Sequence, residues 1–375
     1  MIYFDHAATT ATLKGAEEIF IRENRELFAN PSSGHAFGRE ANKKLESARE
    51  SILADLHLSK THNLIFTSGA TESNNLALKG VAFHYQKRGK RILTSAVEHP
   101  SVLNALKELE PFGFQIVLLP VNADGVVEPS ALEKAMDNNT ILVSIMAVNN
   151  EIGSINDIAA LSAIVHRYPK AYFHVDATQA IGKVAFDYSQ ADLLSFSGHK
   201  FGAFKGSGAL LYKKSIAFEA INAGGEQENG FRAGTVNMPG ALAMAYALHQ
   251  AVSQEKEHGE QVQQIKQYLL QNLSGMDGVE MNSPLNGCPY VLNFSLTKKK
   301  ASVVVEALSE NEIYVSTVLA CSSEEPISYV IEALGKSEDL AKNSIRLSFS
   351  YENTLEEAKT FLEVFSTIMQ GVNDR

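Results

Sequence analysis

The chain has 375 residues, of which 45% are hydrophobic and 20% are charged, and its formal net charge is −10. This length is sufficient for a large core and for two domains packed together. The negative charge gives no general attraction to nucleic acid or to anionic lipid, and therefore disfavours both as partners. The two cysteines cannot form a disulfide framework, which is typical of proteins in a reducing compartment.

The amino-terminal residues and the apolar stretches bear on location. Asp5 and His6 lie where a signal peptide would have its basic start and its apolar run, so we expect no export and a cytoplasmic protein. The longest apolar stretches, such as residues 140–148, are far shorter than the roughly 20 residues needed to cross a bilayer. The sequence therefore predicts no association with a membrane.

Short apolar runs alternate with amphipathic helical patterns along the first 250 residues. The helical patterns lie between most of the runs and cross over from one to the next. Strands joined in this way indicate a mostly parallel sheet with helices on both faces, an α/β fold. The predicted strands are 63–67, 91–95, 115–119, 140–147, 171–175, 193–197 and 208–212, and the main predicted helices are 72–87, 101–109, 158–168 and 239–258.

From about residue 254 the pattern changes to a long polar helix followed by isolated strands at 290–295 and 344–348. We interpret this part as a smaller α+β domain. Residues 15–253 would then form the large domain, and residues 1–14 and 254–375 the small one. Ligands of a parallel sheet bind beyond the carboxyl ends of its strands, so the residues that follow each strand are candidates for a site.

The turn after the strand at 63–67 reads SGATE and enters a helix. The free N–H groups of such a turn could bind a phosphate. Taken alone, however, the turn favours an ordinary helix cap, formed by Thr71 at the N-cap or by Ser68 and Glu72 in the first turn. Nucleotide motifs fit no better, because G-x-G-x-x-G is absent and GKS at 335–337 lacks the first glycine of a P-loop.

Two further strand ends carry reactive residues. Asp176 could keep a ring nitrogen protonated, with Gln179 one helical turn further on, or it could cap the next helix. Lys200 follows the strand at 193–197, and a lysine in such a turn is usually a solvated charge. Burial there would lower its pKa and leave an amine able to form a Schiff base. Ser197 and His199 could add hydrogen bonds to a phosphate, and together the three loops have the groups that bind pyridoxal phosphate.

These loops resemble the family blocks of cysteine desulfurases of the NifS/IscS type, which belong to the class V group of fold-type I pyridoxal-phosphate enzymes. The resemblance extends almost from end to end and implies a large cofactor-binding domain with a smaller α+β domain. The matching blocks are SGATESNN (68–75), VDATQA (175–180), SFSGHK (195–200), YFDHAATT (3–10), NPSS (30–33), EH (98–99), NNEIG (149–153), RAGT (232–235) and IRLS (345–348).

The resemblance also implies roles for single residues. Lys200 would hold pyridoxal 5'-phosphate as a Schiff base, and His99 would stack on its ring and take part in catalysis. Thr235 would reach the phosphate of a partner subunit's cofactor, which implies a homodimer with shared sites. Arg346 would grip the substrate carboxylate in a bidentate manner. The other cofactor-binding residues would be Ala70, Thr71, Asn150, Asp176, Gln179, Ser197 and His199, and the other substrate-binding residues Asn30 and Asn150; no metal site is assigned.

The two cysteines receive different predictions. Cys321, in LACSS (319–323), resembles the family cysteine that attacks the substrate sulfur. L-cysteine would become L-alanine, and the persulfide on Cys321 would pass to an acceptor protein, either an iron–sulfur scaffold or a tRNA thiolase. The loop is two residues shorter than is usual, and Glu324 and Glu325 would raise the thiol pKa. Cys288 is predicted to be a buried, inert thiol.

Three other functions remain open. Another class V enzyme, such as a selenocysteine lyase or an aminotransferase, would make Cys321 incidental. A non-catalytic sulfur-transfer scaffold could retain the fold, although an intact Lys200, Asp176 and His99 argue against it. A nucleotide-binding α/β protein is disfavoured by the missing glycine motifs.

Overall fold

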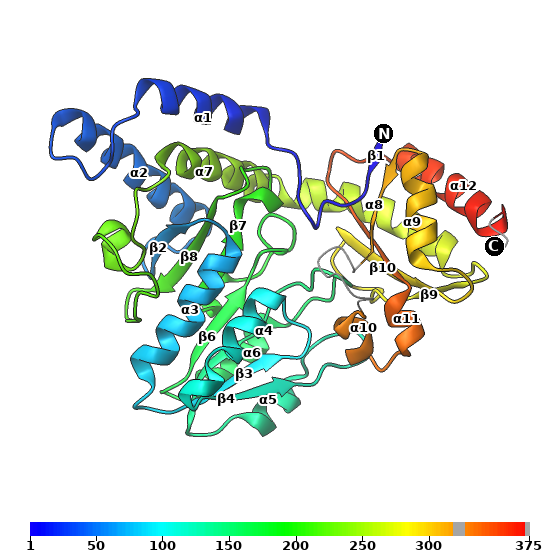
Figure 1. The fold of residues 1–375 in the computed structure, drawn as a ribbon, viewed down its shortest axis with the longest axis horizontal. Coiled ribbons are helices and arrows are strands. Elements are labelled where there is room, and N and C mark those ends of the chain that lie inside the picture. Colours follow the sequence, from blue (N-terminus) through cyan, green and yellow to red (C-terminus); the bar gives the residue numbers. More distant parts are fainter. Residues whose placement is uncertain (318–326, 372–375) are drawn as a thin grey trace.

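The computed structural model describes residues 1–317 and 327–371, and its largest element is a seven-stranded sheet with helices on both faces (Figure 1). The strand order is β2-β8-β7-β6-β5-β3-β4. Only β8 runs antiparallel to its neighbours within this sheet, so the predicted α/β fold with a mostly parallel sheet is confirmed. The strands are β2 (His62–Thr67), β3 (Arg91–Ser95), β4 (Gln115–Leu119), β5 (Thr140–Ser144), β6 (Tyr172–Asp176), β7 (Leu193–Ser197) and β8 (Gly208–Lys213).

The sheet is covered on both faces because successive strand residues, which point to opposite sides, are both apolar. Leu193 belongs to the core that includes α3 (Ala70–Tyr85) and α4 (Pro100–Lys107). Its neighbour Leu194 belongs to the core on the other face. That second face is covered by α2 (Ala36–Asp55), α6 (Ile158–Val165) and α7 (Met238–Ser253), and α1 (Lys14–Glu26) lies along α7 (Figure 1). The helix α5 (Pro129–Ala135) packs near β4.

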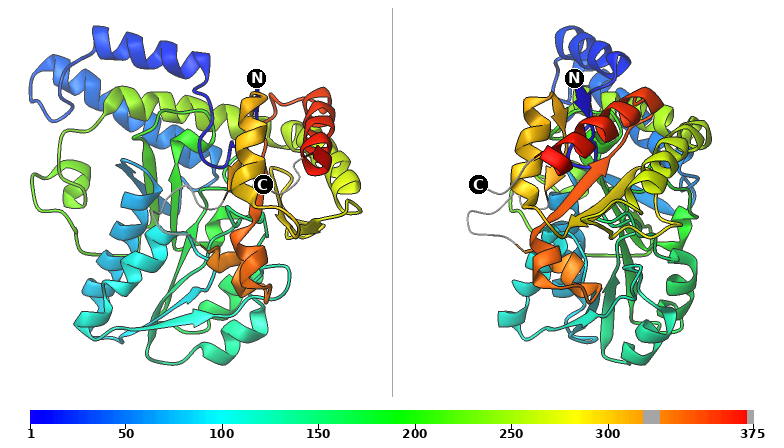
Figure 2. Two further views of the ribbon diagram at one scale, coloured as in Figure 1. Left: turned by 45° about the vertical axis from the view of Figure 1, so that its right-hand side comes forward. Right: turned by 90° about the vertical axis from the view of Figure 1, so that its right-hand side faces the viewer.

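After α7 and α8 (Glu255–Leu273) the chain builds a second, antiparallel sheet in the order β12-β13-β10-β9. Helices α8, α9 and α12 lie together around this sheet, on one side of the molecule (Figure 2). The strands are β9 (Val279–Met281), β10 (Val291–Leu296), β12 (Ser316–Thr317) and β13 (Ser344–Ser348). The helices are α9 (Ala301–Glu310), α10 (Tyr329–Ala333), α11 (Glu338–Lys342) and α12 (Leu355–Gly371).

Several predicted boundaries were wrong by a few residues. The single helix predicted over 239–258 is interrupted at Gln254, whose φ of −110° and ψ of 7° leave the helical region, and the chain continues as α8. The strand predicted over 140–147 ends at Ser144, although the N–H groups of Ile145 and Ala147 still donate to the β6 carbonyls of His174 and Asp176. The helix predicted over 158–168 ends at Val165.

The first residues of the chain lie against its last third. Strand β1 (Ile2–Tyr3) pairs in parallel with β11 (Ile313–Tyr314), and Asp5 forms an isolated bridge with Ser348. These pairings support the division into a large domain, residues 15–253, and a small domain, residues 1–14 and 254–375, which we retain as a proposal.

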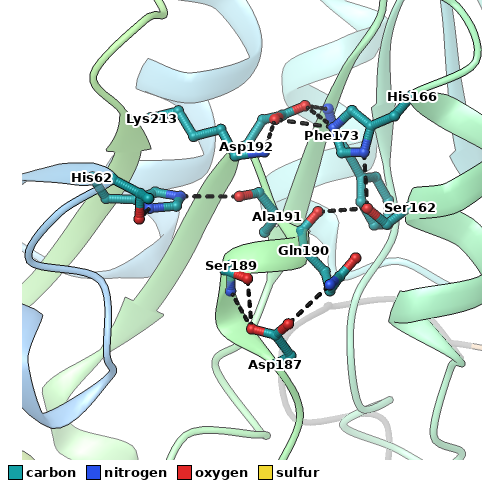
Figure 3. A network of polar contacts seen from close by, with 11 residues as sticks. His62, Ser162, His166, Phe173, Asp187, Ser189, Gln190, Ala191, Asp192 and Lys213 are labelled. Atoms are coloured by element: carbon teal, nitrogen blue, oxygen red, sulfur yellow. Dashed lines mark hydrogen bonds and ion pairs between the residues drawn. The ribbon is translucent and has the colours of Figure 1, made fainter.

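A polar network ties the amino ends of the central strands together (Figure 3). The carboxylate of Asp192, just before β7, accepts hydrogen bonds from the Phe173 N–H at 2.7 Å and from His166 Nε2 at 3.0 Å. Lys213 Nζ lies 2.7 Å from the same carboxylate. Burial would raise the pKa of Asp192, but the hydrogen bonds from His166 and Lys213 hold it below its usual value. The network therefore joins β6, β7, β8 and the end of α6 around one buried negative charge.

None of the helices formed by residues 1–317 and 327–371 combines the length and the apolar character that a membrane span requires.

Candidate active site

Three of the predicted residues lie at the carboxyl edge of the large sheet, opposite the Asp192 network. Asp176 closes β6, and His99 is the N-cap of α4 after β3. Lys200 ends the short 3₁₀ turn η3 (Gly198–Lys200) that follows β7. Because β3, β6 and β7 are parallel, these side chains belong to one edge of the sheet, where ligands of such sheets bind.

Among the residues that the structure describes, the Lys200 amine is held by backbone carbonyls and not by a carboxylate. Its Nζ donates to the Ala7 carbonyl at 2.5 Å and to the Ala8 carbonyl at 2.7 Å. Burial lowers the pKa of Lys200 to about 7, and the positive charges of Lys183 and Arg346 contribute to this shift. At neutral pH, Lys200 is therefore a free amine in a large fraction of the molecules, as a nucleophilic lysine requires.

Asp176 is 4% exposed and is bound by neutral donors. Its Oδ2 accepts from Asn74 Nδ2 at 2.8 Å, and its Oδ1 accepts from the Thr178 N–H at 3.0 Å. Asn74 also donates to Ser101 Oγ at 2.9 Å, and Ser101 Oγ lies 2.8 Å from His99 Nδ1. A hydrogen-bonded chain thus connects the carboxylate to the histidine.

His99 is held as a neutral imidazole. The Ser101 N–H donates to His99 Nδ1 at 3.1 Å, so the ring proton belongs on Nε2. Burial lowers the pKa of His99, an effect that Asp176 opposes and Lys200 reinforces. The residue before it, Glu98, is fully buried, and its Oε1 accepts from Ser95 Oγ at 2.6 Å and from the Met146 N–H at 2.8 Å. Burial raises the pKa of Glu98 to about 8, so this carboxyl is mainly protonated at neutral pH.

The turn into α3 has a backbone conformation that requires glycine. Gly69 is the N-cap with φ of +152°, a region that is open essentially to glycine alone. The Ala70 N–H donates to Ser197 Oγ at 2.7 Å, which joins this turn to the end of β7. The alternative in which Thr71 is the N-cap is wrong, whereas Glu72 does accept from the Ser68 N–H at 2.6 Å. The remaining N–H groups of the first turn have no acceptor within the helix.

The amino-terminal segment completes the edge. The Ala7 carbonyl also accepts from Gln179 Nε2 at 3.0 Å, and His199 Nδ1 lies 3.1 Å from Thr9 Oγ1. Arg346, on β13, donates from Nη2 to Asp5 Oδ1 at 2.7 Å. It also donates from Nη1 to the backbone carbonyl of Asn150 at 3.0 Å. The structure therefore brings Arg346, Gln179, His199 and Asn150 to the same segment as Lys200.

Two predicted residues, Asn30 and Thr235, form no hydrogen bond with this cluster among the described residues. Asn30 is exposed between α1 and α2, and its Oδ1 accepts from the nearby Ser32 N–H at 2.9 Å. Thr235 is exposed and lines a cavity of about 110 Å³ beside the turn into α3, together with Ser68 and Arg232. Cys321 lies outside the described residues.

Comparison with known proteins identifies the family of the chain. A sequence model of the family described as aminotransferase class-V matches residues 2–361. The chain belongs to the class V aminotransferase family.

The class V assignment is supported by relatives that span the whole chain. A NifS/IcsS protein homolog of Lactobacillus delbrueckii subsp. bulgaricus is 41% identical, over 99% of this chain and 97% of its own length. Cysteine desulfurase IscS of Dictyoglomus turgidum is 40% identical, over 98% of this chain and 94% of its own. A solved NifS-like protein superposes with a TM-score of 0.91 at 36% identity, covering 98% of this chain and 99% of that one. The chain is thus an enzyme of the class V fold, as the sequence predicted.

Sequence reasoning missed several residues of this class V site. Asn74 lies inside the recognised SGATESNN block, and its helical spacing from the Gly69 turn was a usable signal. Asp5 lies in the YFDHAATT block, but pairing it with Arg346 required knowledge of the fold. The carbonyl of Ala7 offered no signal, because every residue type carries a backbone carbonyl.

Proposed function

We propose that this class V enzyme is a cysteine desulfurase that uses pyridoxal 5'-phosphate and collects sulfur as a persulfide on Cys321. The observation that supports this most directly is the Lys200 amine, whose pKa is about 7 and which lies at the sheet edge that also holds Asp176 and His99. An enclosed amine of this kind is suited to condense with an aldehyde. The names of the full-length relatives favour a desulfurase over the lyase, aminotransferase and scaffold alternatives.

The residues at this edge fit pyridoxal phosphate. Asp176 is hydrogen-bonded by Asn74 and Thr178 but has no cationic partner within the described chain, so it can accept a bond from a protonated ring nitrogen. The phosphate fits the positive amino end of α3. When bound, the cofactor supplies an aldehyde and an electron-accepting ring. We assign Lys200 to its aldehyde and His99 to its ring face. We assign Ala70, Thr71, Ser197 and His199 to the phosphate, with Asn150 and Gln179 beside the ring, and Thr235 to the phosphate of a partner subunit.

Arg346 is the residue that we assign to the substrate carboxylate, with Asn30 and Asn150 as further contacts. Its Nη2 is bound to Asp5, whereas its Nε is buried without a partner in the described parts of the chain. A guanidinium with one unused donor can bind a carboxylate through two parallel hydrogen bonds if Asp5 gives way. This orients L-cysteine with its amine toward Lys200.

Two groups of the chain can move protons during the reaction. Lys200, as a free amine, can accept the α-proton of the substrate at Nζ. His99 carries its proton on Nε2 and can donate it there, since Nδ1 is engaged by Ser101. The sulfur of Cys321, as a thiolate, then forms a bond with the substrate sulfur while the bond between that sulfur and the β-carbon breaks. The β-carbon gains a proton, alanine leaves, and a persulfide remains on Cys321.

We further propose a homodimer, a cytoplasmic location and transfer of the persulfide sulfur to an acceptor protein. The acceptor would be an iron–sulfur scaffold or a tRNA thiolase. The homodimer follows from the role assigned to Thr235, which is exposed and is therefore available to a second subunit.

The test is the release of alanine from L-cysteine by purified protein. We expect alanine to form in the wild type and to fall by roughly 1,000-fold or more in Lys200→Ala and in Cys321→Ser. Cys321→Ser should still show the absorbance change of bound cysteine, because the residues that hold substrate remain. A Lys200→Ala protein that released alanine at the wild-type rate would refute the proposal. Selenocysteine cleavage that survived in Cys321→Ala, with no cleavage of cysteine by the wild type, would favour the lyase.

A further inference from the structure

The site contains a second amine that the proposed mechanism does not use. Lys183 lies beyond β6, one helical turn after Gln179, and its Nζ donates to Gln179 Oε1 at 3.2 Å. It also lies 5.8 Å from the centre of the Tyr290 ring. The turn before it is tightly fixed, because Gly182 has φ of +68° and a side chain there would meet Ala251 of α7 at 2.5 Å. Lys183 is therefore held at one point, between the large sheet and the residues that lead into β10.

The hydrogen bond from Lys183 decides how the Gln179 side chain is oriented. An amide group has an oxygen that accepts and a nitrogen that donates. Because an ammonium can only donate, Gln179 must turn its oxygen toward Lys183. Its Nε2 then points toward the Ala7 carbonyl, which it reaches at 3.0 Å and which also accepts from Lys200 at 2.5 Å. Lys183 and Lys200 are thus linked through one amide and one carbonyl.

We propose that Lys183 is a positioning residue of the active site, which fixes the donor side of the Gln179 amide toward the Ala7 carbonyl that also binds Lys200, and which holds a positive charge near Lys200. This role rests on the proposed function and extends it. The charged groups that face Lys200 are Lys183 and Arg346, which favour its free amine, and Asp5 and Asp176, which favour its ammonium form. Lys183 lowers the pKa of Lys200 more than Arg346 does, and it adds to the effect of burial in lowering the pKa values of His6 and His199.

The chain provides a matched control in Lys266. This lysine is also enclosed, and burial lowers its pKa to about 8, as it does for Lys183. However, its Nζ donates to the Cys288 carbonyl at 2.8 Å and has no part in the Gln179 contacts. Lys183→Met and Lys266→Met therefore remove the same charge and the same volume, but only the first removes the contact with Gln179.

The experiment measures the reactivity of Lys200 in cofactor-free protein. An acetylating reagent is applied over a range of pH, and mass spectrometry gives the labelling rate at Lys200. We expect the midpoint pH to rise by roughly one unit in Lys183→Met, because a neighbouring like charge is lost. It should stay near the wild-type value in Lys183→Arg and in Lys266→Met. An unchanged midpoint in Lys183→Met, or an equal shift in Lys266→Met, would overturn the proposal; Lys183→Gln replaces Lys183→Met if the latter does not fold.

A second measurement, the affinity for pyridoxal phosphate, tests the orientation of the Gln179 amide. We expect Lys183→Met to weaken binding of pyridoxal phosphate roughly threefold to tenfold, which is the effect of one misplaced hydrogen bond, while Lys266→Met binds as the wild type does. Equal cofactor affinity in Lys183→Met and the wild type would contradict the positioning of Gln179. If the wild type itself bound no pyridoxal phosphate, the proposed function would fail, whereas the labelling result would still decide the effect of Lys183 on Lys200.

Discussion

Two buried carboxyl groups, at opposite edges of the same sheet, are kept in opposite states: Asp192 precedes β7 and Glu98 follows β3. At the amino ends, Asp192 is ionised, because His166 and Lys213 supply positive partners and the Phe173 N–H a third hydrogen bond (Figure 3). At the carboxyl ends, Glu98 is mainly protonated, because burial raises its pKa to about 8 and its acceptor bonds come from neutral donors. The sheet therefore has a charged, hydrogen-bonded carboxylate at its amino edge and an uncharged, hydrogen-bonded carboxyl group at its carboxyl edge.

The difference extends to the surrounding polar groups. Asp192 is matched by partners of the described chain. At the other end, Asn74 Oδ1 and Thr178 Oγ1 are buried without partners in the part of the chain that the structure describes, and the Lys200 amine has only carbonyls to bind. Buried polar groups without partners are costly for stability, so they are expected where a ligand will supply the missing bonds. We infer that the amino ends serve stability and the carboxyl ends serve chemistry.

The largest expected effects come from a matched pair of substitutions, Asp192→Asn and Asp176→Asn. Asp192→Asn leaves Lys213 without its carboxylate and should lower the free energy of unfolding by roughly 3 kcal/mol at pH 7. Asp176→Asn removes no cationic partner, so it should change that free energy by about 1 kcal/mol or less but slow alanine formation by roughly 100-fold. Denaturant unfolding and alanine assays on both variants test this. Similar losses of stability in the two variants would break the comparison.

The Asp192 effect should also depend on pH. Since its folded pKa lies below the usual value, its stabilisation is fully present above the unfolded pKa of about 4 and disappears as the pH falls through the folded pKa. The stability difference between the wild type and Asp192→Asn should therefore shrink in acid. A difference that stayed constant down to the acid limit of folding would show that the charge of Asp192 is not what matters.

Glu98→Gln should have a smaller effect with the opposite pH dependence. The folded protein keeps the Glu98 proton up to about pH 8, whereas the unfolded chain releases it near the usual value of 4.5. Wild-type stability therefore falls as the pH rises between these values. Glutamine resembles the protonated acid, so the stability of the variant relative to the wild type should rise by about 2.5 kcal/mol between pH 5 and pH 7, measured by urea unfolding. Parallel pH profiles would mean that Glu98 is already ionised at neutral pH.

The smallest expected effect is that of Cys288→Ser. Cys288 is fully buried, and burial raises the pKa of its thiol, although Lys183 and Lys266 lie near enough to oppose that shift. The variant should form alanine at a rate within about twofold of the wild type and lose about 1 kcal/mol of stability, because a hydroxyl is less tolerated in the core. A large loss of alanine formation would assign Cys288 a part in the chemistry, in place of the inert role that its burial supports.

The sequence predicts most of the fold and the local part of the site, for a physical reason. Strands buried on both faces give continuous apolar runs, so β3 and β7 were predicted with their observed bounds. The bounds of β4 were also predicted, although it is an edge strand with an exposed Leu118. Asp176, His99 and Lys200 follow strands directly, and parallel strands bring such positions to one edge. The break between α7 and α8 was missed, because Gln254 is neither glycine nor proline and interrupts the helix without a local signal.

Contacts between distant segments could not be predicted. Lys200 and Ala7 are 193 residues apart, and Arg346 and Asp5 are 341 residues apart. In the first pair the acceptor is a backbone carbonyl, and because every residue has one, the residue type gives no indication of the contact. The second joins a cation and an anion that could each have had many other partners. Arg346 itself was assigned through the family resemblance, which carries information about position that the residue alone does not.

The attachment of the amino terminus to the reaction centre has a practical consequence for handling the protein. Residues 5–9 provide the acceptors for the Lys200 amine, the Gln179 amide and the Arg346 guanidinium, as well as a hydroxyl next to His199. A fusion tag or a protease cut at this end would act within a few residues of those groups. Preparations trimmed there would look like folded enzyme by size and lose activity, so a carboxyl-terminal tag after α12 is the safer choice for purification.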